Sequence, residues 1–349
     1  MDLIEQSLQQ QLSQHPASLE GLWVVDENLA ALSQMAVQEG MSLLTNRFDL
    51  LQRGEAQQWP IRFSDFDFSP WSDASLDRLY YRVSKEKAVV HHVINQAWRM
   101  LKPGGELRLL GAKNEGTKTY YDKARKLFGQ GELDKLGKGN FAATLTKSDA
   151  QASPESPLLD DRDYSQFRPI ADDFISKPGL FGWDKQDQGS AFLAEHFAEL
   201  WPCLKKTQPR VLDLGCGYGY LSAKAHAQGV ASITATDNNA AAALACQRNF
   251  DRLGISGDVV VDNCAASQTD RFDLVLCNPP FHQGFSVEGE LTERFVAAAA
   301  RLTAFDGAAA FVVNHFIPLE RKASGLFREI DLFADNGSFK LIRLARPKG

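Results

Sequence analysis

Residues 210–219 read Arg-Val-Leu-Asp-Leu-Gly-Cys-Gly-Tyr-Gly, an apolar run that leads directly into alternating glycines. The run is typical of a buried strand, and the glycines predict a sharp turn before a helix that begins near Tyr220. Glycine lets the backbone approach a ligand closely because it has no Cβ. In open α/β sheets, ligands bind outside the carboxyl ends of the strands. The stretch therefore predicts an α/β fold with a ligand at this turn.

The stretch begins a series of apolar runs that alternate with helical patterns. The strand-like runs are residues 210–214, 232–236, 258–261, 272–277 and 308–313, and helical patterns at 239–253 and 288–302 lie between them. This alternation predicts a doubly wound parallel sheet that is covered on both faces. Nearer the C-terminus, Asp335-Asn336-Gly337 separates the runs 327–333 and 339–344. Asn-Gly between apolar runs predicts an antiparallel hairpin at the end of the sheet.

The chain has 349 residues, a length that suits two domains. Residues 148–169 are polar and acidic with three prolines, which is typical of a linker. The first half repeats the pattern of the second less clearly, with strand-like runs at 21–25, 63–68, 78–83 and 106–111 and a helix at 91–101 that ends in a turn at 102–105. We interpret the halves as a degenerate duplication, although α/β domains share such patterns generally. The predicted boundaries are 1–152 for the first domain, 153–169 for the linker and 170–349 for the second domain.

The composition is that of a folded protein, with 44 % apolar and 23 % charged residues. The net charge of −6 argues against a long footprint on naked nucleic acid, but it leaves room for a local basic patch. The first fifteen residues lack the pattern of a signal peptide, and no apolar run reaches the length of a membrane span. The five cysteines form no C-x-x-C pair. We therefore expect a cytoplasmic protein with reduced thiols, no metal and no membrane contact.

Polar residues follow the first three strands of the second half. Asp213 stands before the glycines, where a carboxylate can pair with a ligand ammonium but would repel a pyrophosphate. Asp237 ends the next strand, where an acid accepts hydrogen bonds from ribose hydroxyls, or alternatively caps the following helix. Asp262 and Asn263 follow the third strand, where a side chain can reach an adenine amino group or simply form a turn.

The sequence Asn278-Pro279-Pro280-Phe281 follows the strand at 272–277. Prolines stiffen the backbone and lack N–H donors, so the Asn278 amide oxygen and the Pro279 carbonyl can accept both N–H bonds of a planar amino group. Phe281 offers a flat face on which a base can stack. A methyl sulfonium is already a strong electrophile, so transfer to that nitrogen needs mainly positioning and exclusion of water. The motifs together predict an S-adenosylmethionine-dependent methyltransferase with Asn278, Pro279 and Phe281 as its catalytic residues.

Two neighbouring features have open roles. His282 could touch the substrate or accept the released proton, or it could be a structural hydrogen-bonding residue. The segment 181–190 could cover the methionine end of the cofactor through Asp187, Gly189 and a helix N-terminus. It could equally be no more than the capped start of the helix predicted at 191–200.

These residues resemble the guanine-N2 methyltransferases of bacterial ribosomal RNA, most closely the small-subunit members and next the large-subunit members. The matching stretches are DLGCGYG at 213–219, NPPFH at 278–282, PGLF-x5-DQGS at 178–190 and GSFKLIR at 337–343, whereas residues 183–186 depart from the family pattern. The resemblance implies an α/β fold with two tandem class I (Rossmann-like, doubly wound) methyltransferase domains, a terminal antiparallel hairpin and a degenerate N-terminal domain.

The first half fits that expectation. Its first strand ends at Asp26 with no glycine loop, and residues 81–85 stand where the second half has Asn278 to Phe281. A domain without either motif should bind neither cofactor nor target, and the resemblance implies that it guides RNA docking. Its basic residues could face RNA or form an ordinary solvated helical surface; they are Lys113, Lys118, Lys123, Arg125, Lys126, Lys135 and Lys138.

The resemblance assigns roles residue by residue. Asp213, Gly215, Gly217 and Gly219 would form the S-adenosylmethionine loop, Asp237 would hold the ribose, and Asn263 would lie near the adenine. Asn278, Pro279 and Phe281 would hold a flipped guanine, and Asn278 also counts among the cofactor-binding residues. The implied partner is ribosomal RNA within a small ribosomal subunit or its precursor, and the expected enzyme is a cytoplasmic monomer.

Three other functions share some of these motifs. A protein glutamine-N5 methyltransferase uses a similar motif but normally carries a small helical N-terminal domain. Adenine-N6 methylation shares the motif as well. A non-catalytic RNA-binding or ribosome assembly factor would have no need of an intact Asp213, Asp237 and Asn278.

Overall fold

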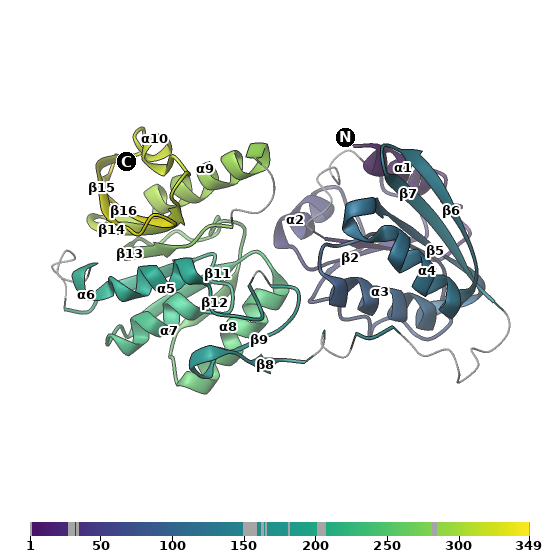
Figure 1. The fold of residues 1–349 in the computed structure, drawn as a ribbon, viewed down its shortest axis with the longest axis horizontal. Helices are drawn as coiled ribbons and strands as arrows, with labels where there is room; N and C mark the ends of the chain where they lie inside the picture. The colour runs from purple at the N-terminus through teal and green to yellow at the C-terminus, as the bar shows by residue number, and fades with distance from the viewer. Residues whose placement is uncertain are drawn as a thin grey trace. The chain divides into compact units, whose positions relative to one another are not determined.

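The computed structural model describes residues 2–26, 32, 35–148, 159–161, 164, 166–180, 182–200, 207–280 and 285–348, without the side chains of 172 and 285–290. The chain divides into two compact units, Met1–Gln166 and Phe167–Gly349. Within the described residues, each unit is built on a mixed seven-stranded sheet with helices against it (Figure 1). The predicted α/β fold with two Rossmann-like sheets is confirmed.

The sheet of the second unit has the strand order β12-β11-β10-β13-β14-β16-β15. Neighbouring strands from β12 to β14 are parallel, whereas β16 runs antiparallel to both β14 and β15. The parallel strands and the terminal hairpin therefore occur as predicted. The strands are β10 (Arg210–Leu214), β11 (Ser232–Asp237), β12 (Asp258–Val261), β13 (Phe272–Cys277), β14 (Thr303–Asn314), β15 (Phe327–Asp335) and β16 (Phe339–Pro347).

Helices cover both faces of this sheet. Val211 and Leu274 pack toward α5, α7 and α8, and their neighbours Leu212 and Val275 pack toward α9 and α10 on the opposite face (Figure 1). Because both faces are buried, the strands read as continuous apolar runs. The helices are α5 (Gln188–Glu195), α6 (Phe197–Leu200), α7 (Tyr220–Ala227), α8 (Ala240–Leu253), α9 (Phe285–Leu302) and α10 (Leu319–Ala323).

A buried amide connects the start of this unit to its glycine loop. Asn249 of α8 is 0 % exposed, and its side chain donates to the carbonyls of Ile175 (2.9 Å) and Tyr218 (2.8 Å). Its oxygen accepts the Ile175 N–H at 2.9 Å. The segment before α5 is thereby held against the loop. That segment contains the short elements β8 (Arg168–Pro169), η3 (Ala171–Asp173) and β9 (Ile175–Ser176).

The first unit repeats the same topology, with the strand order β3-β2-β1-β4-β5-β7-β6. Trp23 packs toward α1, and its neighbours Leu22 and Val24 pack toward α3 and α4. The duplicated fold is thus evident in both sheets. The elements are α1 (Leu3–Ser13), β1 (Gly21–Val25), β2 (Met41–Thr45), α2 (Phe48–Ala56), β3 (Ile61–Phe63), β4 (Leu76–Arg82), α3 (Lys87–Met100), β5 (Leu101–Ala112), η2 (Lys113–Glu115), α4 (Thr117–Phe128), β6 (Gly129–Gly137) and β7 (Asn140–Lys147).

Two sequence predictions for the first unit differ from the structure. The predicted strand at 63–68 is wrong beyond Phe63, because the Ser64 hydroxyl accepts the Asp67 N–H at 3.0 Å and turns the chain. The predicted turn at 102–105 is a bulge inside β5, where Leu76 pairs with Leu101 and Arg78 pairs with Glu106. The strand β2 and the hairpin of β6 and β7 were not predicted.

The end of the acidic segment expected as a linker packs on the first unit. Leu159 exchanges hydrogen bonds with the Asn95 side chain, at 2.7 and 2.8 Å. Tyr164 is 2 % exposed, donates its hydroxyl to Asp65 at 2.7 Å and stacks on His92 with ring centroids 4.4 Å apart. These contacts anchor residues 159–164 where they are described.

Candidate active site

The glycine loop joins β10 to α7 and has the geometry that glycine permits. Gly217 and Gly219 have φ values of 54° and 87°, in the left-handed region that other residues rarely adopt. A Cβ on Gly219 would lie 2.8 Å from the Cys246 sulfur, so α8 packs too closely for a side chain there. A Cβ on Gly217 would have no atom within 4 Å. Gly217 therefore presents an open backbone face that a ligand can approach.

Asp237 at the end of β11 holds this loop in place. Its carboxylate accepts the N–H of Gly217 at 3.0 Å and the N–H of Asn239 at 2.9 Å. The cap of α8 is Asn239, whose side chain accepts the Ala241 N–H at 2.8 Å. The alternative of Asp237 as the helix cap is therefore wrong, and its ribose-binding role stays a prediction.

Asp213 is 1 % exposed and only partly hydrogen-bonded. Its Oδ2 accepts the backbone N–H and the hydroxyl of Ser222, at 2.9 and 2.7 Å. Its Oδ1 is buried and has no hydrogen-bond partner among the described residues. Burial raises the pKa of Asp213 to about 6, and the nearby Asp237 adds to the rise, while the Ser222 hydrogen bonds oppose it. A buried carboxylate oxygen without a donor is costly, and a cationic ligand group would relieve that cost.

The residues after β12 form a turn beside Asp237. Asp262 donates its N–H to the Asp237 carbonyl at 2.9 Å, and its buried carboxylate accepts N–H groups from Asn263 (2.7 Å) and Ser267 (2.8 Å). Asn263 is half-buried, and its side-chain oxygen accepts a hydrogen bond from Arg294 of α9. The predicted turn is thus formed by Asp262. The adenine contact of Asn263 stays a prediction, with its amide already oriented by Arg294.

Asn278 follows β13 directly and is held through its amide nitrogen. Its Nδ2 donates to Asp187 Oδ1 at 2.6 Å and to the Ser190 hydroxyl at 2.9 Å. Pro279 is buried and Asn278 half-buried. Phe281 and His282, to which the sequence assigned target contacts, lie outside the described residues.

Asp187 and Ser190 come from the N-terminus of α5, far from Asn278 along the chain. Asp187 caps the helix, since its Oδ1 accepts the Ser190 N–H at 2.7 Å. Gly189 fits against the Phe339 ring, which a Cβ would approach to 3.2 Å. The sequence predicted the cap, but it gave no sign that the same carboxylate reaches Asn278, because 91 residues separate them.

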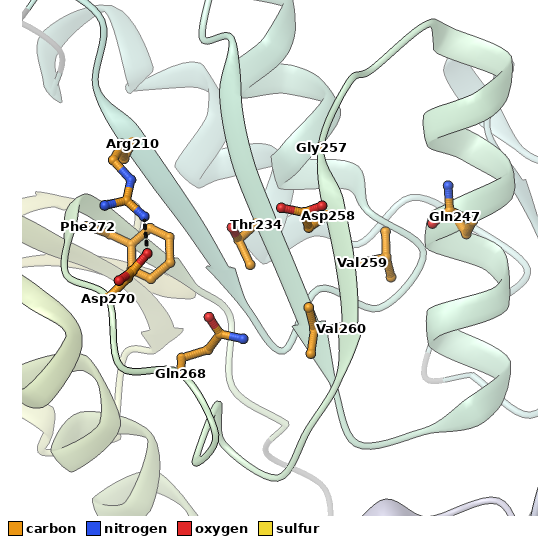
Figure 2. Close-up of a pocket in the computed structure, with 10 residues that line it drawn as sticks. All are labelled: Arg210, Thr234, Gln247, Gly257, Asp258, Val259, Val260, Gln268, Asp270 and Phe272. Atoms are coloured by element: carbon orange, nitrogen blue, oxygen red, sulfur yellow. Dashed lines mark hydrogen bonds and ion pairs between the residues drawn. The ribbon is translucent and has the colours of Figure 1, made fainter.

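A hollow in the same unit lies at the other end of the strands. The hollow has a volume of ≈ 410 Å³. Figure 2 shows its lining residues, among them Arg210, Asp258 and Phe272 at the amino ends of β10, β12 and β13. The guanidinium of Arg210 already forms an ion pair with Asp270, at 2.8 Å. None of the described site residues lines it. The predicted site residues Asp237, Asn263 and Asn278 lie instead at or just beyond the carboxyl ends of β11, β12 and β13.

The described residues give no indication of a metal centre or a membrane span. Within them, no group of three or more His, Cys, Asp or Glu residues could hold a metal ion. No described helix is both long enough and apolar enough to span a bilayer. Cys216, Cys246, Cys264 and Cys277 are free thiols.

The fold and this site define a class I methyltransferase. Residues 172–343, which lie in the second unit, match the family model of the methyltransferase small domain. The chain is an S-adenosylmethionine-dependent methyltransferase.

Among known methyltransferases, the chain is similar to enzymes named for ribosomal RNA. The chain is 28 % identical over 273 residues to the ribosomal RNA small subunit methyltransferase C of Shewanella loihica, with 77 % of each chain covered. The protein of that name from Enterobacter sp. is 27 % identical over 274 residues, covering 77 % of this chain and 76 % of its own. The solved T. thermophilus 16S rRNA N2 G1207 methyltransferase, in complex with AdoMet and guanosine, has the same fold, with a TM-score of 0.81, 23 % identity and coverage of 99 % and 92 %. The resemblance to ribosomal RNA guanine-N2 methyltransferases is confirmed.

Replacing Asp213 by Asn should stabilise the ligand-free protein and weaken cofactor binding. With a pKa near 6, native Asp213 keeps a proton that the unfolded chain releases near 3.8. Stability should therefore fall as the pH rises from about 4 to about 6, by a few kcal/mol. Asp213→Asn removes this loss, so its melting temperature should exceed that of the parent at pH 8 and converge with it near pH 4.

Asp262→Asn is the matched control, because Asp262 is also 1 % exposed. Both of its oxygens accept N–H groups, so an amide would set one N–H against another and cost roughly 1–3 kcal/mol at every pH. Calorimetric melting from pH 4 to 8 measures both variants. If Asp213→Asn were less stable than the parent at pH 8, the conclusion that the buried Asp213 carboxylate destabilises the ligand-free protein would be contradicted.

Proposed function

We propose that this enzyme transfers a methyl group from S-adenosylmethionine to the exocyclic N2 amine of a guanine in 16S ribosomal RNA. The observation that carries the proposal is the Asn278 amide, whose nitrogen is hydrogen-bonded to Asp187 and Ser190. The Asn278 amide oxygen therefore points away from Asp187 and Ser190, where it can accept a hydrogen bond from an amino group. The relatives named ribosomal RNA small subunit methyltransferase C, and the guanosine complex of the T. thermophilus enzyme, support guanine in small-subunit RNA as the target.

The residues at the carboxyl ends of β10 to β12 fit the cofactor. We assign the loop of Gly215, Gly217 and Gly219 to its amino-acid portion, since Gly217 is open to a ligand. The unpartnered Oδ1 of Asp213 suits an ammonium group. We assign Asp237 to the ribose and Asn263 to the adenine. When bound, the cofactor supplies an electrophilic methyl group.

The residues after β13 are assigned to the target. The Asn278 oxygen and the Pro279 carbonyl would each accept one N–H of the amine, which fixes its plane and orients the nitrogen for in-line attack. The nitrogen of Pro280 carries no hydrogen and so offers no competing donor. Phe281 would stack on the guanine and Asn278 would border the cofactor. Extruding the base from its stack costs a few kcal/mol, least in an unpaired loop.

The first unit is proposed to bind RNA without cofactor chemistry. In the sheet register Arg82 stands where the second unit has Asn278. Arg78 pairs with Glu106, the sixth residue of β5, just as Leu274 pairs with Ala308, the sixth residue of β14. Arg82 is held by Asp2 at 3.0 Å and by Glu115 at 3.7 Å, so the end of β4 is occupied by internal ion pairs. A second α/β unit also disfavours a protein glutamine substrate, whose enzymes normally carry a helical domain there.

An exposed basic surface on the first unit supplies a docking site. Lys118, Arg125 and Lys126 on α4 are exposed, as are Lys113, Lys135 and Lys138 nearby. None of them forms an ion pair with a described residue. Lys123 differs, because it is half-buried and contacts the His91 ring at 3.3 Å. We propose that these six residues contact RNA phosphates, which reconciles a net charge of −6 with RNA binding.

The cellular context follows from the substrate. We propose that the enzyme works as a monomer in the cytoplasm, on a small ribosomal subunit or its precursor. The acidic net charge suits RNA that is already partly coated by protein, because such a particle presents less bare phosphate than naked RNA.

A direct assay of the product tests the proposed function. The enzyme is incubated with methyl-labelled cofactor and, separately, with small subunits, large subunits, free ribosomal RNA and a release factor. We expect label on guanine N2 of small-subunit RNA, located by mass spectrometry of nuclease fragments. Label on adenine N6 or on a protein glutamine would overturn the assignment.

Asn278→Ala should abolish methyl transfer and leave cofactor affinity nearly unchanged, since the variant removes one of the two acceptors for the target amine. Single-turnover rates and calorimetric titration with the cofactor measure the two effects separately. A large loss of cofactor affinity would show that Asn278 mainly binds the cofactor and would contradict its proposed role as an acceptor for the target amine.

Lys126→Glu should weaken RNA binding and reduce its salt dependence, whereas Arg53→Glu, an equal charge reversal on α2, should change binding far less. Each lost phosphate contact lowers the slope of log affinity against log salt by about 0.7–1. Equal effects of the two variants would show a non-specific influence of net charge.

A further inference from the structure

We propose that Asp187 and Ser190 are positioning residues that set the orientation of the Asn278 amide. The inference rests on the proposed function, because it concerns how Asn278 meets the target amine. Neither residue is proposed to touch the target base. They act through Asn278, and Asp187 has the larger effect.

Both hydrogens of the Asn278 amide nitrogen have acceptors. The nitrogen lies 2.6 Å from Asp187 Oδ1 and 2.9 Å from the Ser190 hydroxyl. A primary amide has only two N–H bonds, so these contacts use its full donor capacity. The amide plane and the direction of its oxygen are thereby fixed.

The reversed amide would be inactive and is disfavoured by Asp187. Rotation by half a turn would set the Asn278 oxygen against the Asp187 carboxylate, two acceptors with no hydrogen between them. It would also point the Asn278 nitrogen at the target amine, two donors with no acceptor between them. A carboxylate cannot donate, so it rejects the reversed form, whereas the Ser190 hydroxyl can donate or accept and accommodates both. Asp187 therefore determines the orientation.

The carboxylate also changes the acceptor strength of the amide. A hydrogen bond to an ionised group is roughly twice as strong as one between neutral groups. Hydrogen bonding at Nδ2 polarises the amide and increases the negative charge on its oxygen. The target nitrogen would gain positive charge as the new N–C bond forms and the methyl–sulfur bond breaks, and it would lose that charge when a proton leaves to water. A more negative Asn278 oxygen stabilises the charge in between. Asp187 thus favours the transition state more than the bound substrate.

The fold holds Asp187 firmly in this place. The same Oδ1 accepts the Ser190 N–H at 2.7 Å as the cap of α5. Ser190 is 8 % exposed and Leu193 is 0 % exposed, so the start of the helix is packed. Gly189 rests against the Phe339 ring of β16. The carboxylate is therefore fixed before any ligand arrives.

The test separates this positioning from helix capping. Asp187→Ser keeps a good N-cap, because Ser and Asp cap comparably, but its side chain is too short to reach Asn278. We expect kcat to fall by about ten- to a hundredfold, as when supporting groups behind a catalytic ligand are removed. The melting temperature and the cofactor dissociation constant should stay close to those of the parent.

Two further variants show how much each acceptor of the Asn278 amide contributes to kcat. Asp187→Asn should restore most of kcat, since an amide oxygen that accepts the Ser190 N–H can also accept from Asn278. Ser190→Ala removes the second acceptor and should lower kcat less than Asp187→Ser. Asp2→Ser at the cap of α1 is the matched control and should leave kcat unchanged.

Nuclear magnetic resonance gives a readout that does not depend on turnover. The side-chain amide signals of Asn278, assigned by their absence in Asn278→Ala, should exchange slowly with solvent in the parent and faster in Asp187→Ser. Parent-like kcat in Asp187→Ser, or a loss confined to cofactor affinity, overturns the inference. Failure of the parent to methylate guanine would overturn the proposed function instead, so the two failures are distinguishable.

Discussion

A parallel sheet that is buried on both faces leaves room for polar side chains only where its strands end. In the second unit β13 is buried along its whole length, and Asn278 is the half-buried polar residue that follows its end. Asp237 stands at the corresponding end of β11. Because parallel strands end at the same edge, residues far apart in sequence meet there. The backbone hydrogen bonds of the sheet thus determine where the chemistry can occur.

Much of this arrangement could be predicted from the sequence, because the responsible signals are local. The apolar runs located the strands of the second unit along the chain, and the glycines marked the turn after β10. The contact between Asp187 and Asn278 could not be predicted, since it depends on how α5 packs across the sheet. The unpartnered oxygen of Asp213 is also a tertiary property, because only packing removes its access to water. The strand expected at 63–68 failed because a single serine hydroxyl turned the chain after Phe63.

The two units have the same sheet topology but different residues at the carboxyl ends of their strands. Both sheets have the same strand order, yet the first has Arg82 where the second has Asn278. Arg82 of the first unit is enclosed by internal acids. These ion pairs favour stability, whereas the second unit retains an open glycine face beside the buried Asp213. This difference is expected when one copy keeps a ligand site and the other does not, because binding sites commonly sacrifice stability.

The hydrogen bond between Asp187 and Asn278 has a consequence for how the enzyme becomes active. It joins a helix that precedes β10 to the residue that follows β13, with the glycine loop and α8 between them in the chain. A partly folded chain with the loop after β10 but without α5 leaves the Asn278 amide free to rotate. With the role proposed for Asn278, competence for transfer arises only when the sheet and α5 are both in place. Catalytic activity would then report completed folding, whereas cofactor affinity alone would not.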